Sequence, residues 1–199
     1  MNTDMLDLLK IVLAFLGGSV VTFGIQSAWS YFSRPKLRLV TQGNAGLLVR
    51  TPGAWLRQDQ PPVSEEFLFL RMLVKNAGWR TARSCIAYVS KIIWIDRDGK
   101  EQVFADSDLI EMQWSWHGHT AVDIPRGAYY YIDLFKFWKS NLGSAFCSDR
   151  FPSYLQKWGA GGGRIYFFVK VCCDNAAPVE GHVHFEWDGT WDGNAQIIK

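Results

Sequence analysis

A chain of 199 residues can form one domain of ordinary size with an additional terminal segment. Hydrophobic residues make up 48% of the chain and charged residues 20%, which excludes an intrinsically disordered protein. The formal net charge of +2 argues against a strongly basic nucleic-acid-binding protein, so no nucleic-acid partner is expected. The four cysteines lack the C-x-x-C spacing of a zinc ribbon and are too few for a disulfide-rich scaffold.

The first element in the chain is an apolar segment that predicts a transmembrane helix at residues 11–33. It contains no Asp, Glu, Lys or Arg, and as a helix it would span roughly 35 Å, enough to cross a hydrocarbon core of about 30 Å. Pro35 follows the segment and would end the helix. The alternatives are a buried helix of a soluble protein and a cleaved signal peptide. A signal peptide would need a basic n-region, whereas here Asp4 and Asp7 precede the single Lys10.

Positively charged residues lie mainly on the C-terminal side of this segment. Lys10 precedes it, whereas four cations follow it: Arg34, Lys36, Arg38 and Arg50. Since cytoplasmic flanks carry the excess of Lys and Arg, we expect a single-pass protein of the bacterial inner membrane with a cytoplasmic C-terminal domain. The adjacent Cys172 and Cys173 would point to opposite faces of a strand, which fits thiols kept reduced in the cytosol.

One face of the predicted helix carries small residues at helical spacing. These residues are Ala14, Gly17, Gly24 and Ala28. Small side chains let two helix backbones approach closely in lipid, so this face predicts a homo-oligomer formed through the transmembrane helix. The alternative is that glycine is simply frequent in membrane helices and the segment is a plain anchor.

Short segments rich in strand-forming residues follow the anchor and predict one all-β domain over residues 34–199. In chain order these segments are 36–41, 46–51, 66–76, 84–95, 101–104, 110–117, 127–138, 164–173 and 181–187. Asp98-Gly99 between two of them is a hairpin signal. One helix is expected in this domain, at residues 151–158. Several short strands at this spacing are typical of a sandwich or a barrel.

Two motifs make the fold prediction more specific. Residues 74–78 (VKNAG), followed by Ala82 and residues 85–89, resemble the V-x-N-x-G…A…V-x-V hairpin of bacterial immunoglobulin-like domains of the CARDB type. Residues 124–127 (IPRG) resemble the I-P-x-G turn of the same domains. The resemblance covers roughly residues 67–135 and implies an immunoglobulin-like antiparallel β-sandwich that acts as a binding or spacer module, without catalytic residues. The chain departs from that family in its tryptophan content and in a long insertion at residues 141–163.

The histidines are the candidate metal ligands. All four lie in two H-x-H pairs, His117 with His119 and His182 with His184. Alternate residues of a strand face the same way, so each pair could ligate one metal ion, and neighbouring strands would complete a zinc site. Gly118 and Gly181 indicate strand ends. The sequence favours a solvated strand face instead, and we expect no metal and no cofactor.

No motif predicts an enzyme. The glycine run at residues 160–164 lacks the G-K-[ST] of a phosphate-binding loop, and no G-x-S-x-G nucleophile motif is present. The repeated Trp-Asp-Gly at residues 187–193 predicts two turns. Four tryptophans are candidates for the aromatic wall of a ligand groove, with burial in the core as the alternative: Trp114, Trp116, Trp187 and Trp191.

Together these features predict a single-pass, membrane-anchored β-sandwich that binds or senses a protein partner. Its layout resembles membrane effectors of bacterial antiphage (antiviral) defence, in which a sensing domain controls a short transmembrane segment that damages the membrane during abortive infection. The alternative is a membrane-tethered ligand-binding or scaffolding subunit without membrane-damaging activity. A metal-dependent enzyme that uses the H-x-H pairs is a third hypothesis.

Overall fold

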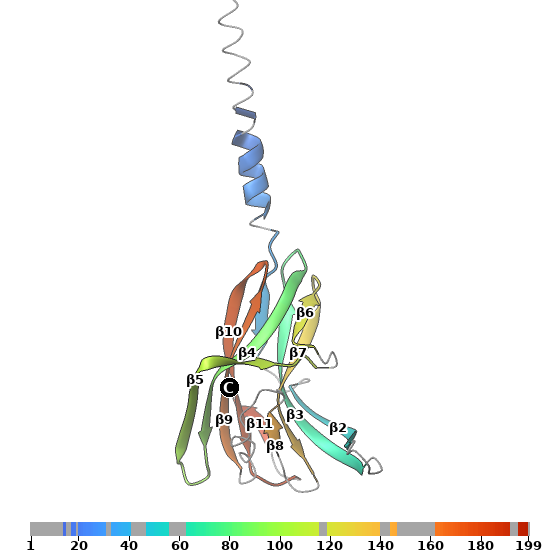
Figure 1. Ribbon diagram of the computed structural model, residues 1–199, viewed down its shortest axis with the longest axis vertical. Coiled ribbons are helices and arrows are strands. Elements are labelled where there is room, and N and C mark those ends of the chain that lie inside the picture. The colour runs from blue at the N-terminus through green and yellow to red at the C-terminus, as the bar shows by residue number, and fades with distance from the viewer. Residues whose placement is uncertain are drawn as a thin grey trace, which may run out of the picture. The chain divides into compact units, whose positions relative to one another are not determined.

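The computed structural model describes residues 14, 17–18, 20–30, 33–40, 47–55, 63–115, 119–139, 144–146, 162–191 and 195–198. The chain divides into two compact units, Met1–Arg34 and Pro35–Lys199, called unit 1 and unit 2 below (Figure 1).

The described part of unit 1 is helical. Residues 20–30 form a continuous helix, and Ala14, Gly17 and Gly18 are helical as well. Its large apolar side chains are 60–73% exposed, and they are Val20, Val21, Phe23, Ile25 and Trp29. Within the described ranges, no helix combines the length and the apolar character needed to cross a membrane. The predicted span of residues 11–33 also includes residues outside those ranges.

Two hydroxyl groups of this helix bond to its own backbone. Thr22 Oγ1 donates to the carbonyl of Gly18 at 2.7 Å, and Ser30 Oγ donates to the carbonyl of Ser27 at 2.8 Å. Such local bonds satisfy a polar side chain on a helix without any other partner.

Unit 2 contains two antiparallel sheets in a sandwich-like arrangement (Figure 1). The first sheet has the order β1-β3-β7-β8, with β2 also paired to β3. Its strands are β1 (Leu37–Val40), β2 (Leu48–Trp55), β3 (Val63–Asn76), β7 (Tyr129–Trp138) and β8 (Ser144–Phe146). The second sheet has the order β11-β10-β9-β4-β5, with β6 also paired to β4. Its strands are β4 (Ala82–Ile95), β5 (Glu101–Met112), β6 (Ala121–Ile124), β9 (Gly163–Cys173), β10 (Ala176–Trp187) and β11 (Ala195–Ile198).

Alternate side chains of the two sheets fill one hydrophobic core between them. The bulkiest side chains with less than 2% exposure are aromatic: Trp114, Phe135, Phe137, Phe167 and Phe185. The ring centroids of Phe135 and Phe137 lie 4.7 Å apart in an edge-on arrangement, and those of Phe137 and Trp187 lie 4.1 Å apart. Much of the high aromatic content of the chain is therefore used for packing between the sheets.

The prediction of a mainly β domain is confirmed, with differences in detail. The predicted strand 101–104 and the first three residues of the predicted strand 110–117 belong to one strand, β5, which continues past an irregularity in its pairing with β4 and ends at Met112. The sequence did not indicate β6, β8, β11 or the first half of β10. The helix expected at residues 151–158 lies outside the described part of the chain.

Gly181 was expected at a strand end but lies inside β10. A Cβ atom at this position would lie 2.9 Å from Cδ1 of Leu39 on β1. The glycine is therefore explained by the close approach of the two sheets rather than by a turn.

A buried asparagine joins the two motifs that carried the family resemblance. Asn76 Nδ2 donates to the carbonyls of Arg80 at 2.7 Å and Ile124 at 2.9 Å. Its Oδ1 accepts the backbone N–H groups of Gly78 at 2.9 Å and Lys36 at 3.2 Å. All the hydrogen-bonding capacity of this side chain is used, as a fully buried amide requires.

Candidate functional site

A pocket of about 530 Å³ lies at one end of unit 2. It forms where β4 turns into β5, where β9 begins and where β10 ends beside β11. Its walls include Arg97, Arg164, Glu186, Trp187, Asp188 and Gln196.

The pocket is remote from the point at which the chain enters unit 2. The backbone of Lys36 bonds to Asn76 and Ala77, beside the first residues of β4. Ile95, the last residue of β4, lines the pocket. Fourteen residues at about 3.3 Å each make this strand roughly 45 Å long. We therefore call the Asn76 side of unit 2 the proximal end and the pocket side the distal end.

A tight turn between β4 and β5 forms one wall of the pocket. Asp96 Oδ1 accepts the N–H of Lys100 at 2.8 Å, and the N–H of Gly99 donates to the carbonyl of Asp96 at 3.1 Å. Gly99 has a φ of +80°, which a glycine adopts without strain. The Asp-Gly signal in the sequence thus marks the turn that places Arg97 on the pocket.

Two glycines of the run before β9 let the strand pass between its neighbours. Gly163 has a φ of +134°, and a Cβ there would lie 2.3 Å from the carbonyl oxygen of Ile95. A Cβ on Gly162 would lie 2.8 Å from the backbone of Asp188 and 2.9 Å from Nε of Arg97. Glycine at these two positions therefore allows close packing of the backbone. The sequence had predicted only a loop here, without a phosphate-binding motif.

An exposed ion pair forms the opposite wall. Arg164 Nε lies 2.9 Å from Glu186 Oε1, and Gln196 Nε2 donates to Glu186 Oε2 at 3.0 Å. The bond from Arg164 lowers the pKa of the Glu186 carboxyl, and the same bond raises the pKa of the Arg164 guanidinium.

The turn after β10 forms the floor of the pocket. Asp188 Oδ1 accepts the N–H and the hydroxyl of Thr190 at 2.9 and 2.8 Å, and the Trp187 indole N–H donates to the Thr190 carbonyl at 2.9 Å. The carboxylates of Asp96, Glu186 and Asp188 are thus engaged in bonds within the protein. Arg97 differs, because among the described residues it has no ion-pair partner. The pocket therefore presents a guanidinium that can bind an anionic group.

Trp191 connects the distal end to the other sheet. Its backbone carbonyl accepts Arg50 Nη2 at 3.0 Å, and the Arg50 guanidinium carbon lies 5.4 Å from its ring centroid. Lys139 Nζ lies 6.0 Å from the same ring and 2.8 Å from Oε2 of Glu66. Lys139 lowers the pKa of the Glu66 carboxyl. These contacts tie the turn after β10 to β2, β3 and β7.

The three candidate tryptophans that the structure describes do not line one groove. Trp114 is 1% exposed, and its indole N–H donates to the carbonyls of Cys85 and Thr120, each at 3.1 Å. Trp187 and Trp191 are also largely buried, although Trp187 lines the distal pocket. Trp116 lies outside the described residues.

The three histidines that the structure describes lie in two different places. His182 and His184 share the outer face of β10, with stacked rings whose centroids are 4.9 Å apart. Burial lowers the pKa of His184, with a smaller contribution from His182. His119 is exposed just before β6, and β9 and β4 separate β6 from β10. His117 is not among the described residues, and within those that are, no group of three or more His, Cys, Asp or Glu side chains could hold a metal.

A buried ion pair lies outside the pocket. Arg71 Nε on β3 lies 2.6 Å from Asp133 Oδ1 on β7, and the Ser115 hydroxyl also bonds to this carboxylate. The side chain of Arg71 is only 7% exposed. Because the carboxylate is paired and hydrogen-bonded, this group has a structural explanation.

Two cysteines form a thiol pair across β4 and β9. Cys173 packs against the core and hydrogen-bonds to the buried Cys85, and this bond raises the pKa of the Cys173 thiol. Cys172 shares the outer face of β9 with Lys170, because alternate residues of a strand point the same way. The adjacent cysteines therefore point to opposite faces, as their positions on a strand predicted.

Sequence analysis did not single out Arg97, Arg164, Asp188 or Gln196. The available signals were the Asp-Gly hairpin and the Trp-Asp-Gly repeat, which marked the two turns of the pocket. Nothing in the local sequence indicated that these turns lie side by side. The residues of the predicted helix-association face, Ala14, Gly17, Gly24 and Ala28, are helical and exposed in the single chain. Association between copies stays a prediction, because a single chain does not test it.

Comparison with known proteins shows distant structural likeness only. Neither the protein-family models nor the curated proteins contain a match to this chain. The chain is similar to the X-ray structure of the Northeast Structural Genomics Consortium target SoR45, with 11% sequence identity and a TM-score of 0.34. This likeness covers 79% of this chain and 92% of that chain.

Proposed function

We propose that this protein is a single-pass protein of the bacterial inner membrane whose cytoplasmic β-sandwich binds a partner at its distal end. The observation that carries this proposal is the distal pocket, which lies a full strand length from the point where the chain enters unit 2. A tethered domain that binds a partner needs such a site away from its tether.

The membrane anchor is supported by the sequence and by the helix of unit 1. The uncharged segment 11–33 is long enough to span a bilayer. The apolar side chains of its described part are exposed, and the hydroxyls of Thr22 and Ser30 bond to the helix backbone, as lipid surroundings require.

An immunoglobulin-like topology for unit 2 forms part of the proposal. Its support is the side chain of Asn76, which bonds the V-x-N-x-G motif to the I-P-x-G motif. Domains of this type act as binding or spacer modules, and the engaged carboxylates of the distal pocket fit that role.

The chemistry of the pocket suggests its occupant. Arg97 offers a guanidinium that can bind a carboxylate in a bidentate manner, and Gln196 adds an amide. The proposed partner is a protein segment that places an acidic side chain or a chain terminus against Arg97.

A photo-crosslinking amino acid in the full-length protein tests the site. Placed at Asp98, the exposed neighbour of Arg97 at the distal end, it should leave the guanidinium in place and form one adduct of defined mass in cells. The same amino acid at Arg126 at the proximal end is the control and should not form that adduct. Adducts at position 126 only, or at neither position, would contradict the proposed site.

Topology is tested separately from binding. The protein should stay in the membrane during alkaline carbonate extraction, and a C-terminal tag should be digested by protease only after the inner membrane is permeabilised. Digestion of the tag in intact spheroplasts would reverse the proposed orientation.

The second candidate function, a membrane-damaging effector, depends on helix association. A Cβ at Gly17 or Gly24 would have no neighbour within 4 Å in the single chain. Gly17→Ile and Gly24→Ile should therefore leave the protomer intact and disturb only contacts between copies. If the helix is an effector, both variants should abolish self-association in membrane crosslinking and any depolarisation on overexpression, whereas the control Val20→Ile should not. Wild-type behaviour of all three variants supports a plain anchor and a scaffolding role.

A further inference from the structure

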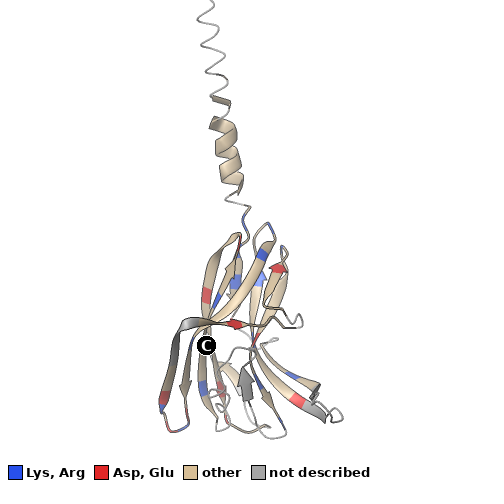
Figure 2. Cartoon of the chain, viewed as in Figure 1, with Lys and Arg blue, Asp and Glu red and all other residues tan. Residues whose placement is uncertain are grey.

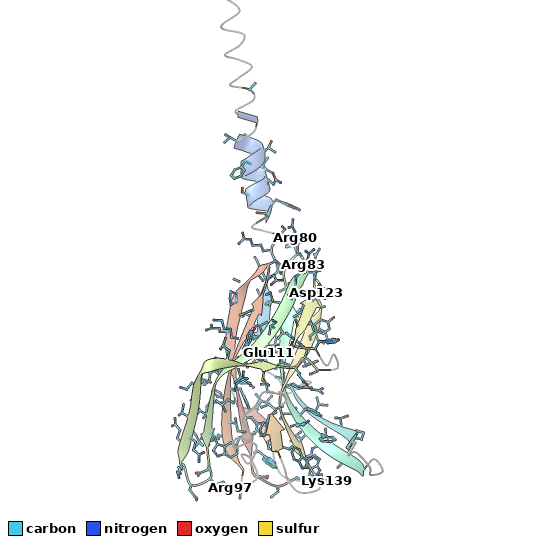
Figure 3. The ribbon with its side chains drawn as sticks, viewed as in Figure 1. Arg80, Arg83, Arg97, Glu111, Asp123 and Lys139 are labelled. Atoms are coloured by element: carbon cyan, nitrogen blue, oxygen red, sulfur yellow. The ribbon has the colours of Figure 1, made fainter. Side chains whose placement is uncertain are left out.

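The proximal end of unit 2 exposes arginine and aromatic side chains close together. Trp79 is 63% exposed and Tyr129 57% exposed, beside the exposed Arg80 and Arg126. The guanidinium carbon of Arg126 lies 3.9 Å from the centroid of the Trp79 ring. Figure 3 places Arg80 and Arg83 at this end of unit 2 and Arg97 at the other.

Positive charge predominates on this surface. Its exposed cations are Lys36, Lys75, Arg80, Arg83 and Arg126, whereas its exposed carboxylates are Asp123 and Asp174. Asp123 is engaged, because its Oδ1 accepts the N–H of Ser84 at 2.8 Å. None of the three arginines has an ion-pair partner within the ranges that the structure describes. Figure 2 shows Lys and Arg positions near this end of both sheets.

The backbone beneath these side chains is held in place. The carbonyl of Arg80 accepts Asn76 Nδ2 at 2.7 Å. The N–H of Arg83 donates to Asn175 Oδ1 at 2.9 Å, and its carbonyl accepts the N–H of Asp174 at 3.1 Å. The arginines are thus presented from fixed turns, which lowers the entropy cost of binding a surface.

The chain enters unit 2 at this same surface. Lys36 bonds through its N–H to Asn76 Oδ1 and through its carbonyl to the N–H of Ala77. If residues 11–33 span the membrane as proposed above, only Arg34 and Pro35 separate the end of the span from Lys36 along the chain.

We propose that the proximal end binds the anionic headgroups of the membrane that anchors the protein. Trp and Tyr favour the interface between lipid and water, and arginine binds phosphate through its planar group of donors. Each arginine near an anionic membrane surface strengthens local binding by about fivefold. This inference rests on the proposed membrane anchor.

The test uses the full-length protein in nanodiscs of phosphatidylcholine, with or without phosphatidylglycerol. Amide hydrogen exchange of residues 77–84 and 122–128 should slow in the phosphatidylglycerol nanodiscs and recover in high salt. The variant Arg80→Gln/Arg83→Gln should lose most of this protection. The variant Arg97→Gln/Lys100→Gln removes the same amount of charge at the distal end, and its residues 77–84 and 122–128 should stay protected from exchange.

Three results would overturn the inference. Equal exchange in the two kinds of nanodisc, with the protein inserted, rejects headgroup binding and leaves the anchor standing. Protection by inorganic phosphate in phosphatidylcholine nanodiscs identifies a site for free phosphate instead. Failure of the protein to enter nanodiscs would contradict both the proposed membrane anchor and the headgroup-binding surface that depends on it.

Discussion

The two ends of unit 2 use similar residues in different ways. Both have turns closed by Asn or Asp side chains, and both have cations near tryptophan rings. At the distal end Arg164 pairs with Glu186 and Lys139 pairs with Glu66, at 2.9 and 2.8 Å. At the proximal end the arginines are exposed and have no such partners among the described residues.

This difference shows why a nearly neutral composition says little about where charge is available. An exposed ion pair contributes at most about 1 kcal/mol to stability. It nevertheless engages both charges, so of the two arginines that line the distal pocket, only Arg97 is without an ion-pair partner among the described residues. The three exposed arginines of the proximal end are without one as well within those residues.

The largest expected effect is at the proximal end. Asn76→Ala removes four hydrogen bonds and leaves buried backbone groups without these partners, including the carbonyl of Ile124 and the N–H of Gly78. We expect a loss of about 3 kcal/mol in the free energy of unfolding, measured by urea denaturation with tryptophan fluorescence. The control Asn175→Ala removes two exposed bonds, to Thr81 and Arg83, and should cost less than about 1 kcal/mol. Similar losses in the free energy of unfolding for both variants would show that the burial of Asn76 does not determine the effect of its substitution.

The next effect distinguishes crowding from backbone strain at the distal end. Gly163 and Gly99 both have positive φ angles, but only Gly163 lacks room for a Cβ. Gly163→Ala should cost about 2–3 kcal/mol and reduce crosslinking from position 98, because the start of β9 must move away from Ile95. Gly99→Ala should cost about 1 kcal/mol. Equal melting temperatures of the two variants would argue against the tight passage of β9.

The smallest effect concerns the distal ion pair. Because Arg164 lowers the pKa of Glu186 in the folded state, the pair stabilises the fold above the unfolded pKa of about 4.3. That contribution is lost as the pH falls through the lower folded pKa. From about pH 6 to about pH 3, the melting temperature of the wild type should fall slightly more than that of Glu186→Gln. Added salt should reduce the difference between the wild type and Glu186→Gln in this fall of melting temperature. A larger fall in Glu186→Gln than in the wild type would contradict the stabilising role of the ion pair.

The parts of the fold that could be predicted were those with a local signal. The alternation of buried residues in β4 and β9 and the Asp98-Gly99 turn can be recognised in a short window, since each residue's environment follows from its neighbours in the chain. The strands β6, β8 and β11 have three or four residues each, and they exist because a longer strand offers them a partner. A short window of the sequence around one of these strands does not include the longer strand with which it pairs.

The sequence by itself determined an apolar N-terminal segment, a mainly β domain after it, and the positions of its principal turns. Only the tertiary structure decided which of these turns meet. It places Arg97, Arg164 and Asp188 around one pocket, buries Trp114 in the core, and puts β9 and β4 between the strand that follows His119 and the strand that carries His182 and His184. The physical reason is that hydrophobic periodicity and turn chemistry act between neighbours in the chain. Strand order and the packing of two sheets depend on contacts between residues far apart in sequence.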